Sequence, residues 1–176
     1  MKVEVEDIQQ RASKIDNGYK NISKTKENLT VKSYEDQRKF LHMGKVFSLH
    51  ELIDTKDLTE EELRKNLKKF YISSCKKIVN QRVKIYQEQL RVKPKCIKVD
   101  ESKSKWGSCT SSRKITFNYR LAMAPVESID YVVVHELCHL LHMNHDRSFW
   151  RKVGSIFPDY KKREEFLQRY APFMTY

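Results

Sequence analysis

The sequence contains few glycines, prolines and cysteines. Its 176 residues include only four of each, which excludes a collagen-like or linker-like protein. The cysteines form no CxxC pair, so we expect reduced thiols and not a disulfide framework. No apolar run approaches the ~18 residues of a membrane-spanning helix, and the N-terminal residues lack the hydrophobic core of a signal peptide. These absences predict a cytoplasmic protein without a membrane partner.

Positive charge is in surplus, because 35 lysines and arginines face 23 acidic residues and give a net charge of +12. Residues 64–93 hold ten of the basic side chains and one acid, so most of the surplus lies in this segment. A basic segment suits a nucleic-acid partner, and it suits a solvated helix face equally well. Hydrophobic residues make up 39% of the chain, which is enough for a core at this length.

The chain divides into a weakly patterned N-terminal segment and one folded domain. Residues 1–38 are polar and rich in lysine, and residues 39–176 form the predicted domain. The domain begins with two short apolar runs around a glycine, which predict two strands. Thr59 and Glu62 then form a capping box that predicts the start of a long basic helix, and Pro94 ends it.

The second half of the chain changes its pattern twice. Residues 96–100 and 114–119 alternate apolar and polar side chains, which predicts two strands joined as a hairpin. Pro125 then opens an apolar stretch with helical spacing, and two shorter helices are expected over residues 146–157 and 160–170. The predicted fold is therefore α+β, with a small sheet and several helices.

Four of the six histidines lie within eleven residues, at positions 135, 139, 142 and 145. On a helix, His135 and His139 share one face about 6 Å apart, which lets both imidazoles bind one metal ion. Zinc is the metal that this pattern favours, with Zn–N distances of about 2.0–2.1 Å. Glu136 follows the first ligand, where its carboxylate can take a proton from a zinc-bound water as the general base. The HExxH pattern therefore predicts a catalytic zinc site.

A catalytic zinc site needs a third protein ligand. His142 lies about 10.5 Å along a continuous helix from His135, too far for one ion to bind both of them together with His139. His145 fits better if the helix ends just after His142 and Asn144 turns the chain back in a left-handed conformation. The pattern therefore predicts His145 as the third ligand.

Other residues near the predicted site have open roles. The alternatives to His145 as the third ligand are the later carboxylates Glu164 and Glu165. Asp146 either caps the next helix or orients a ligand imidazole. Four side chains could stabilise an oxyanion, and the sequence does not separate them: Tyr119, Arg120, Arg147 and Tyr160.

Several separate motifs resemble those of one protein family. They are Lys105-Trp-Gly-Ser-Cys109, Ile115-Thr-Phe-Asn-Tyr-Arg-Leu121, Pro125, Ile129-Asp-Tyr-Val-Val-Val-His-Glu-Leu-Cys-His139, Asn144-His145 and Phe149-Trp150. In this order and spacing, over residues 70–167, the sequence resembles the YgjP-like family of predicted metal-dependent hydrolases, a branch of the zincin metallopeptidases. Its His-x3-His-x5-His spacing is also similar to that of the Wss-like and SprT-like proteases, which cut proteins crosslinked to DNA. His142 stands where metzincins have glycine.

The resemblance implies a zincin-like core. In such a core, an active-site helix carries His135, Glu136 and His139 under a small mixed or antiparallel sheet. The edge strand beside the cleft pairs with an extended peptide, and the strand of this sequence that matches it is residues 115–120. The resemblance also implies that residues 106–109 pack beside the active-site helix.

We therefore expect a cytoplasmic zinc metallopeptidase that hydrolyses bonds in a protein or peptide substrate. His135, His139 and His145 would hold Zn²⁺, and Glu136 would be the base. Two alternatives stay open. One is a nucleic-acid-associated module targeted by residues 64–93, which can coexist with a protease of DNA-linked proteins. The other is a zinc hydrolase of a non-peptide bond, because the metal does not choose the scissile group.

Overall fold

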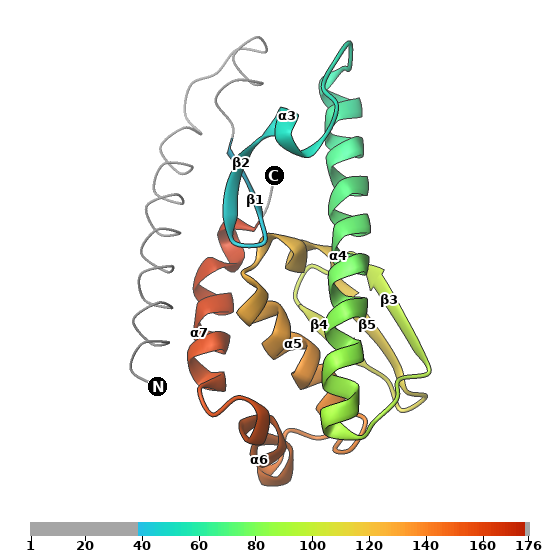
Figure 1. Cartoon of the computed structure of the whole chain (residues 1–176), viewed down its shortest axis with the longest axis vertical. Helices are drawn as coiled ribbons and strands as arrows, with labels where there is room; N and C mark the ends of the chain where they lie inside the picture. Colours follow the sequence, from blue (N-terminus) through green and yellow to red (C-terminus); the bar gives the residue numbers. More distant parts are fainter. Residues whose placement is uncertain (1–38, 175–176) are drawn as a thin grey trace.

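The computed structural model describes residues 39–174 (Figure 1). The predicted N-terminal segment, residues 1–38, lies outside the described residues, so the domain boundary after it stays a prediction. Helices and short strands alternate along the described chain, which confirms the mixed α+β class. The long helix α4 (Glu60–Leu90) and the helix α7 (Tyr160–Tyr170) flank α5 (Val126–Cys138), which lies between them (Figure 1).

Helix α4 begins where its capping box predicts. Thr59 N donates to Glu62 Oε2 over 2.9 Å, and the Thr59 hydroxyl accepts from Glu62 N over 3.4 Å. Arg91 ends the helix in the left-handed conformation with φ 54°, three residues before Pro94. The buried side chains of α4 recur at helical spacing: Leu63, Leu67, Tyr71, Cys75, Ile78, Val79, Val83, Tyr86 and Leu90.

The two strands expected around a glycine are present as a hairpin that leads into a short helix: β1 (Lys39–His42), β2 (Lys45–Ser48) and α3 (Leu49–Leu52). Its two turn residues, Met43 and Gly44, both take positive φ, at 50° and 72°, as a two-residue hairpin turn requires. Gly44 N donates to Met123 O over 3.0 Å, and a Cβ on Gly44 would lie 2.9 Å from Pro125 Cγ. The glycine therefore lets the hairpin dock at the start of α5.

The second sheet differs from the predicted hairpin. Its strands are β3 (Cys96–Asp100), β4 (Gly107–Cys109) and β5 (Lys114–Asn118). β5 is parallel to β3 and antiparallel to β4, so the predicted hairpin of residues 96–100 with 114–119 is wrong. The tight turn joins β4 to β5 instead, where Arg113 N donates to Thr110 O over 2.9 Å.

The strand order β3-β5-β4 also changes which strand forms the edge beside α5. The resemblance assigns that place to residues 115–120, but β5 is the central strand, and the chain turns at Tyr119 into the short helix η3 (Tyr119–Met123). The edge strand that contacts α5 is β4. Three small or polar residues carry no alternating pattern, which is why the sequence did not indicate a strand there.

The two expected C-terminal helices are present as α6 (Arg147–Ile156) and α7, and a short helix η4 (Ala171–Phe173) follows them. Asp146 Oδ1 accepts from Phe149 N over 2.9 Å, so this aspartate caps α6, which is the first of its two predicted roles. The cap fixes where α6 begins, and α6 carries Phe149 and Trp150 toward the histidines.

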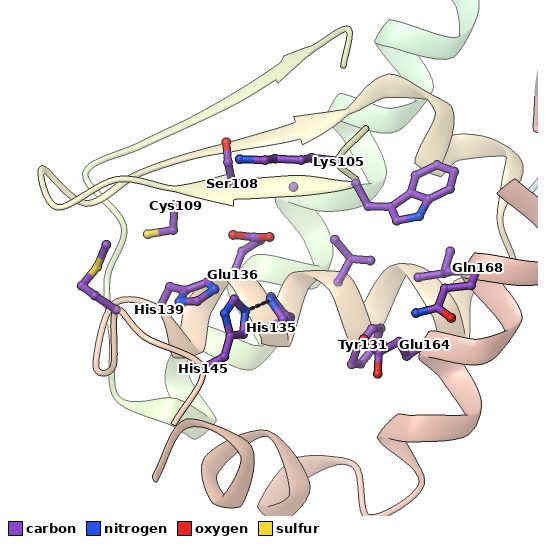
Figure 2. Close-up of a pocket in the computed structure, with 15 residues that line it drawn as sticks. Lys105, Ser108, Cys109, Tyr131, His135, Glu136, His139, His145, Glu164 and Gln168 are labelled. Carbon is purple, nitrogen blue, oxygen red and sulfur yellow. Dashed lines mark hydrogen bonds between the residues drawn. The ribbon is translucent and has the colours of Figure 1, made fainter. Parts of the chain in front are cut away.

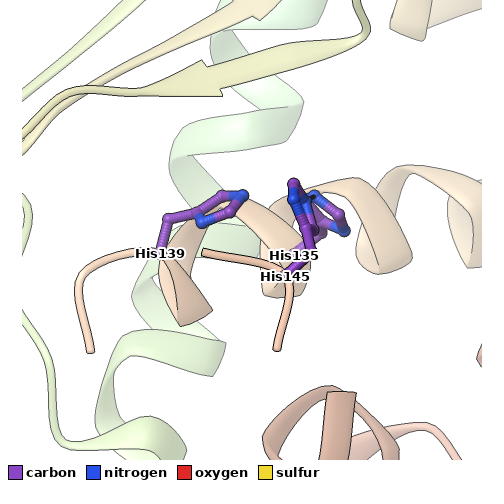
Figure 3. A group of neighbouring side chains, drawn as sticks. All are labelled: His135, His139 and His145. Atoms are coloured by element: carbon purple, nitrogen blue, oxygen red, sulfur yellow. Dashed lines mark hydrogen bonds between the residues drawn. The ribbon is translucent and has the colours of Figure 1, made fainter. Parts of the chain in front are cut away.

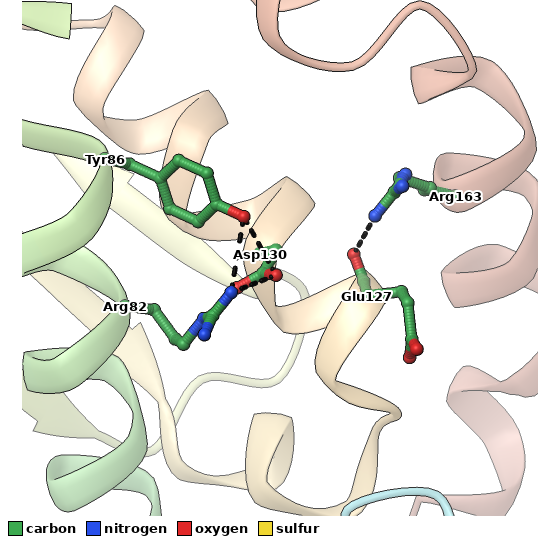
Figure 4. A network of polar contacts seen from close by, with 5 residues as sticks. All are labelled: Arg82, Tyr86, Glu127, Asp130 and Arg163. Carbon is green, nitrogen blue, oxygen red and sulfur yellow. Dashed lines mark hydrogen bonds and ion pairs between the residues drawn. The ribbon is translucent and has the colours of Figure 1, made fainter. Parts of the chain in front are cut away.

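Polar contacts from both neighbouring helices hold α5 (Figure 4). Asp130 of α5 is buried and forms a two-point ion pair with Arg82 of α4, and the Tyr86 hydroxyl donates to Asp130 Oδ2 over 2.9 Å. On the other side, Arg163 of α7 donates to the Glu127 carbonyl over 2.8 Å (Figure 4). Because a buried carboxylate needs such partners, this network fixes the position of α5.

Candidate metal centre and cleft

Three of the four clustered histidines come together in space. His135 lies in the last turn of α5, His139 directly follows that helix, and His145 lies in the loop before α6 (Figures 2 and 3). One ligand nitrogen from each ring lies within 4.8 Å of the others. His135 Nε2 and His145 Nε2 are 3.0 Å apart. In the described part of the chain, no other group of three metal-binding side chains meets this criterion.

The helix ends earlier than the sequence predicts. α5 stops at Cys138, and a tighter turn follows, in which Leu140 N donates to Leu137 O over 3.1 Å and Leu141 N donates to Cys138 O over 3.0 Å. Asn144 is not among the four described non-glycine residues with positive φ, so the predicted left-handed turn at this residue is wrong. The earlier helix end gives the chain six residues in which to return, and His145 reaches the other two rings without that conformation.

His142 contributes through its backbone and not through its ring. His139 Nδ1 donates to the His142 carbonyl over 3.1 Å, which fixes the tautomer and leaves His139 Nε2 as an acceptor. The His142 ring does not line the cavity beside the histidines. No sequence pattern predicts this contact, because it depends on the conformation of the turn.

Aromatic side chains of α6 pack against the three imidazoles. The Phe149 ring centroid lies 4.9 Å from that of His135, 4.6 Å from that of His139 and 4.7 Å from that of His145. Trp150 lies against His135 and His145, and it stacks on Tyr160 at 5.1 Å. Packing of this kind restricts the rings to a few orientations, which favours a preformed site.

The donor atoms fit a bound cation. Two ring nitrogens that face each other across 3.0 Å are close to the ~3.3 Å that two ligands of one tetrahedral zinc ion would have. Beside them, Glu136 Oε2 is buried and has no hydrogen-bond partner among residues 39–174. Buried polar atoms without partners are rare and cost free energy, so they indicate a site that a ligand completes.

Burial controls the protonation of the same groups. It lowers the pKa of His135 to about 3, with smaller contributions from the charges of His139 and His145. It also lowers the pKa of His139, although the contact with the His142 carbonyl opposes this shift. Burial raises the pKa of Glu136 to about 8, and the charge of Lys105 acts in the opposite direction. Neutral imidazoles at neutral pH offer the lone pairs that a metal ion needs.

A cavity of about 460 Å³ runs between β4 and α5 and includes the histidine group (Figure 2). Cys109 and His139 lie at one end of it, and Tyr131, Glu164 and Gln168 lie at the other. Glu136 lies between the two ends, directly under β4. The residues that line the cavity are Lys105, Trp106, Gly107, Ser108, Cys109, Tyr131, Val132, His135, Glu136, His139, Met143, His145, Glu164, Leu167 and Gln168.

The lining differs in part from what the sequence suggested. The four candidates for oxyanion stabilisation do not line the cavity: Tyr119, Arg120, Arg147 and Tyr160. Among the described residues, Lys105 is instead the only lysine or arginine that does, and no sequence pattern indicated a role for its side chain. Tyr131 was also missed, although it precedes His135 by four residues on the same helix and a face argument could have found it. Of the two alternative metal ligands, Glu164 lines the cavity and Glu165 does not.

The basic side chains of α4 are partly used within the protein. Arg64 pairs with Glu60 at 2.8 Å, Lys68 pairs with Glu101 at 2.7 Å, and Arg82 is held by Asp130. The remaining lysines of this helix are exposed: Lys65, Lys69, Lys76, Lys77 and Lys84. A smaller charged surface than the sequence suggested is therefore left for a partner.

Comparisons with known proteins give one family. The model of the YgjP-like metallopeptidase domain matches residues 3–170. Among solved structures, the crystal structure of the metallopeptidase zymogen of Pyrococcus abyssi abylysin is similar, with 21% identity, a TM-score of 0.47, and coverage of 52% of this chain and 93% of that one. A search of curated proteins found no match. None of the described helices is long and apolar enough to cross a membrane.

Proposed function

This chain belongs to the family of YgjP-like metallopeptidase domains, and from that premise we propose that it is a zinc-dependent peptidase. In this proposal His135, His139 and His145 bind the zinc ion and Glu136 acts as general base. The observation that carries it is the convergence of three imidazoles beside a buried carboxylate with an unpaired oxygen, all in one cavity. Three imidazole ligands are typical of catalytic zinc, and neutral imidazole suits zinc well among the available metals.

The residues around the site divide the chemistry between them. When bound, the zinc ion would polarise the scissile carbonyl and lower the pKa of a water molecule. In its ionised form, Glu136 would accept the proton of that water and pass it to the leaving amine. Lys105 favours the ionised form of Glu136, and the His142 carbonyl keeps the His139 ring in the orientation that binds metal. Phe149 supports all three imidazoles from below.

A peptide substrate fits along β4. This strand is the edge of its sheet and lies over Glu136, so its outer backbone groups can pair with an extended chain. Backbone pairing binds a peptide without selecting a sequence, which leaves selection to the side chains of the cavity. We propose in addition that the fold is a zincin-like core and that the protein is cytoplasmic.

The proposed function can be tested by measuring hydrolysis in a variant that lacks the general base. The zinc-loaded wild-type protein should cleave an unfolded protein substrate, and Glu136→Gln should retain its zinc and lose turnover by about 10²-fold or more. Metal content, measured by atomic absorption on both proteins, separates loss of the base from loss of the metal. Turnover at the wild-type rate in Glu136→Gln would show that the assignment of the base is wrong.

The two alternatives from the sequence are weaker. The exposed lysines of α4 could guide the peptidase to nucleic acid, but three other basic residues of this segment are already paired within the protein. A zinc hydrolase of a non-peptide bond would have the same metal and base, but its substrate would not need to pair with the backbone of an edge strand. We therefore favour the peptidase.

A further inference from the structure

The end of the cavity near the start of α5 carries one negative charge. Glu164 of α7 lies there with Tyr131 and Gln168, and Leu167 completes that wall (Figure 2). Among the described residues, the cavity is lined by two acidic side chains, Glu136 and Glu164, and Glu136 belongs to the proposed catalytic site. A second carboxylate in the substrate cleft therefore needs its own explanation.

Glu164 is a half-buried carboxylate that none of the described residues neutralises. It makes no hydrogen bond and no ion pair with any residue from 39 to 174. Its neighbour Arg163 is already used, because its guanidinium contacts Asp159 at 3.1 Å and the Glu127 carbonyl at 2.8 Å. The Glu164 side chain lies beside Tyr131 in the lining of the cavity (Figure 2). A carboxylate set among apolar walls and without a partner attracts a cation more strongly than an exposed one does.

The metal ion does not account for this carboxylate. The ligand atoms that cluster within 4.8 Å come from His135, His139 and His145, and Glu164 is not in that group. Tyr131, beside Glu164, precedes His135 by one helical turn, which is about 6 Å along the axis. A lysine or arginine side chain of a peptide bound at the histidines is long enough to span that distance, so a substrate can supply the cation.

The direction of β4 decides which substrate residue this is. The strand begins at Gly107, over Glu136, and ends at Cys109, near His139 (Figure 2). A peptide that pairs antiparallel with it runs the other way, so the part after the scissile bond lies toward Glu164. Resting on the peptidase function above, we propose that Glu164 selects substrates in which lysine or arginine directly follows the scissile bond.

Binding tests this recognition without catalysis. The probe is a set of capped alanine pentapeptides whose central residue is lysine, arginine, norleucine or glutamate, titrated by calorimetry into the full-length, zinc-loaded Glu136→Gln variant. Lysine and arginine peptides should bind about tenfold more tightly than the norleucine peptide, a factor that Glu164→Gln in the same background should abolish. Glu164→Lys should reverse the preference toward the glutamate peptide.

The control removes the same charge elsewhere. Glu88 is exposed on α4 and does not line the cavity, so Glu88→Gln in the same background should keep the full preference. Equal affinities for the lysine and norleucine peptides, or a preference that persists in Glu164→Gln, would overturn the inference.

Cleavage positions provide the second measurement. The wild-type enzyme acting on a random peptide library should cut on the N-terminal side of lysine and arginine, as read by mass spectrometry, and Glu164→Gln should cut without this preference. Cleavage without a basic residue after the bond would refute the selectivity and leave the peptidase function intact. Charge-selective binding that depends on Glu164, with no cleavage of any peptide, would support recognition by Glu164 and count against the peptidase function.

Discussion

Gly107 and Glu136 lie in such close contact that a Cβ on the glycine would come within 2.6 Å of Glu136 Oε1 and 2.7 Å of Glu136 Cγ. The backbone of the edge strand therefore rests directly on the carboxylate of the proposed base. Only glycine leaves room for both, so the position of Glu136 depends on what stands at residue 107.

Gly107→Ala should lower turnover by about tenfold or more and leave the zinc content unchanged, because the new methyl group displaces the carboxylate and not a histidine. Steady-state kinetics and metal analysis measure the two effects separately. The matched control is Gly154→Ala in α6, where the added Cβ would lie 3.8 Å from the Tyr160 ring, an ordinary contact. Unchanged turnover in Gly107→Ala would show that Glu136 tolerates the shift.

His145→Ala should weaken zinc binding by more than about a hundredfold, since it removes one of three proposed ligands. Competition with a chromophoric chelator measures this affinity. His142→Ala should bind zinc with nearly the wild-type affinity, because the contact with His139 comes from the backbone carbonyl, which the substitution keeps. If His145→Ala bound zinc as tightly as the wild type, the third ligand would have to be another group, with Glu164 the first candidate.

Asp130→Ala should destabilise the fold by about 3 kcal/mol, because it leaves the Arg82 guanidinium without its carboxylate in a partly buried site. Urea unfolding of the metal-free protein gives this difference without a contribution from zinc binding. Glu60→Ala removes the partner of Arg64 in an exposed ion pair and should change stability much less. Equal effects from the two substitutions would show that the Arg82–Asp130 pair does not anchor α5.

His42 should make the fold less stable as the pH falls. Its ring is half-buried against Phe70 and shares a 2.7 Å hydrogen bond with Ser74, and burial lowers its pKa below the ordinary 6.5. The unfolded chain then binds more protons than the folded one below about pH 6.5, so this contribution is present above that pH and is lost as the pH drops. Comparing urea unfolding of the wild type and His42→Gln between pH 5 and 7 isolates it. An identical pH dependence of the two proteins would exclude the contribution.

Nucleic-acid binding, if it occurs, should depend on the exposed lysines of α4 and on salt. Labelled double-stranded DNA titrated at ~50 and ~200 mM salt should bind far more weakly at the higher concentration. The combined substitution of Lys69, Lys76 and Lys84 by glutamine should reduce the salt dependence, whereas glutamine at the paired Arg64 should alter it little. Absence of binding at low salt would leave these lysines as a solvated surface.

Local patterns predicted the parts of the fold that depend on neighbouring residues. The capping box at Thr59, the two-strand hairpin and the helices after Pro125 follow from contacts within a few positions, and the structure contains all of them. The pairing of strands was not predictable in this way. A three-residue strand without an alternating pattern takes the edge of the sheet, and its contacts with β5 come from long-range packing.

The grouping of His135, Glu136 and His139 was predictable from local spacing, because helical geometry places residues four apart on the same face. The sequence also favoured His145 over the later carboxylates as the third ligand, although the left-handed turn expected at Asn144 is not present. Three other relationships became visible in the folded protein alone: which strand covers Glu136, how His145 returns to the other rings, and that Glu164 lines the cleft. Those relationships join segments far apart in the chain, so they depend on the packing of α5 between α4 and α7 and not on any local periodicity.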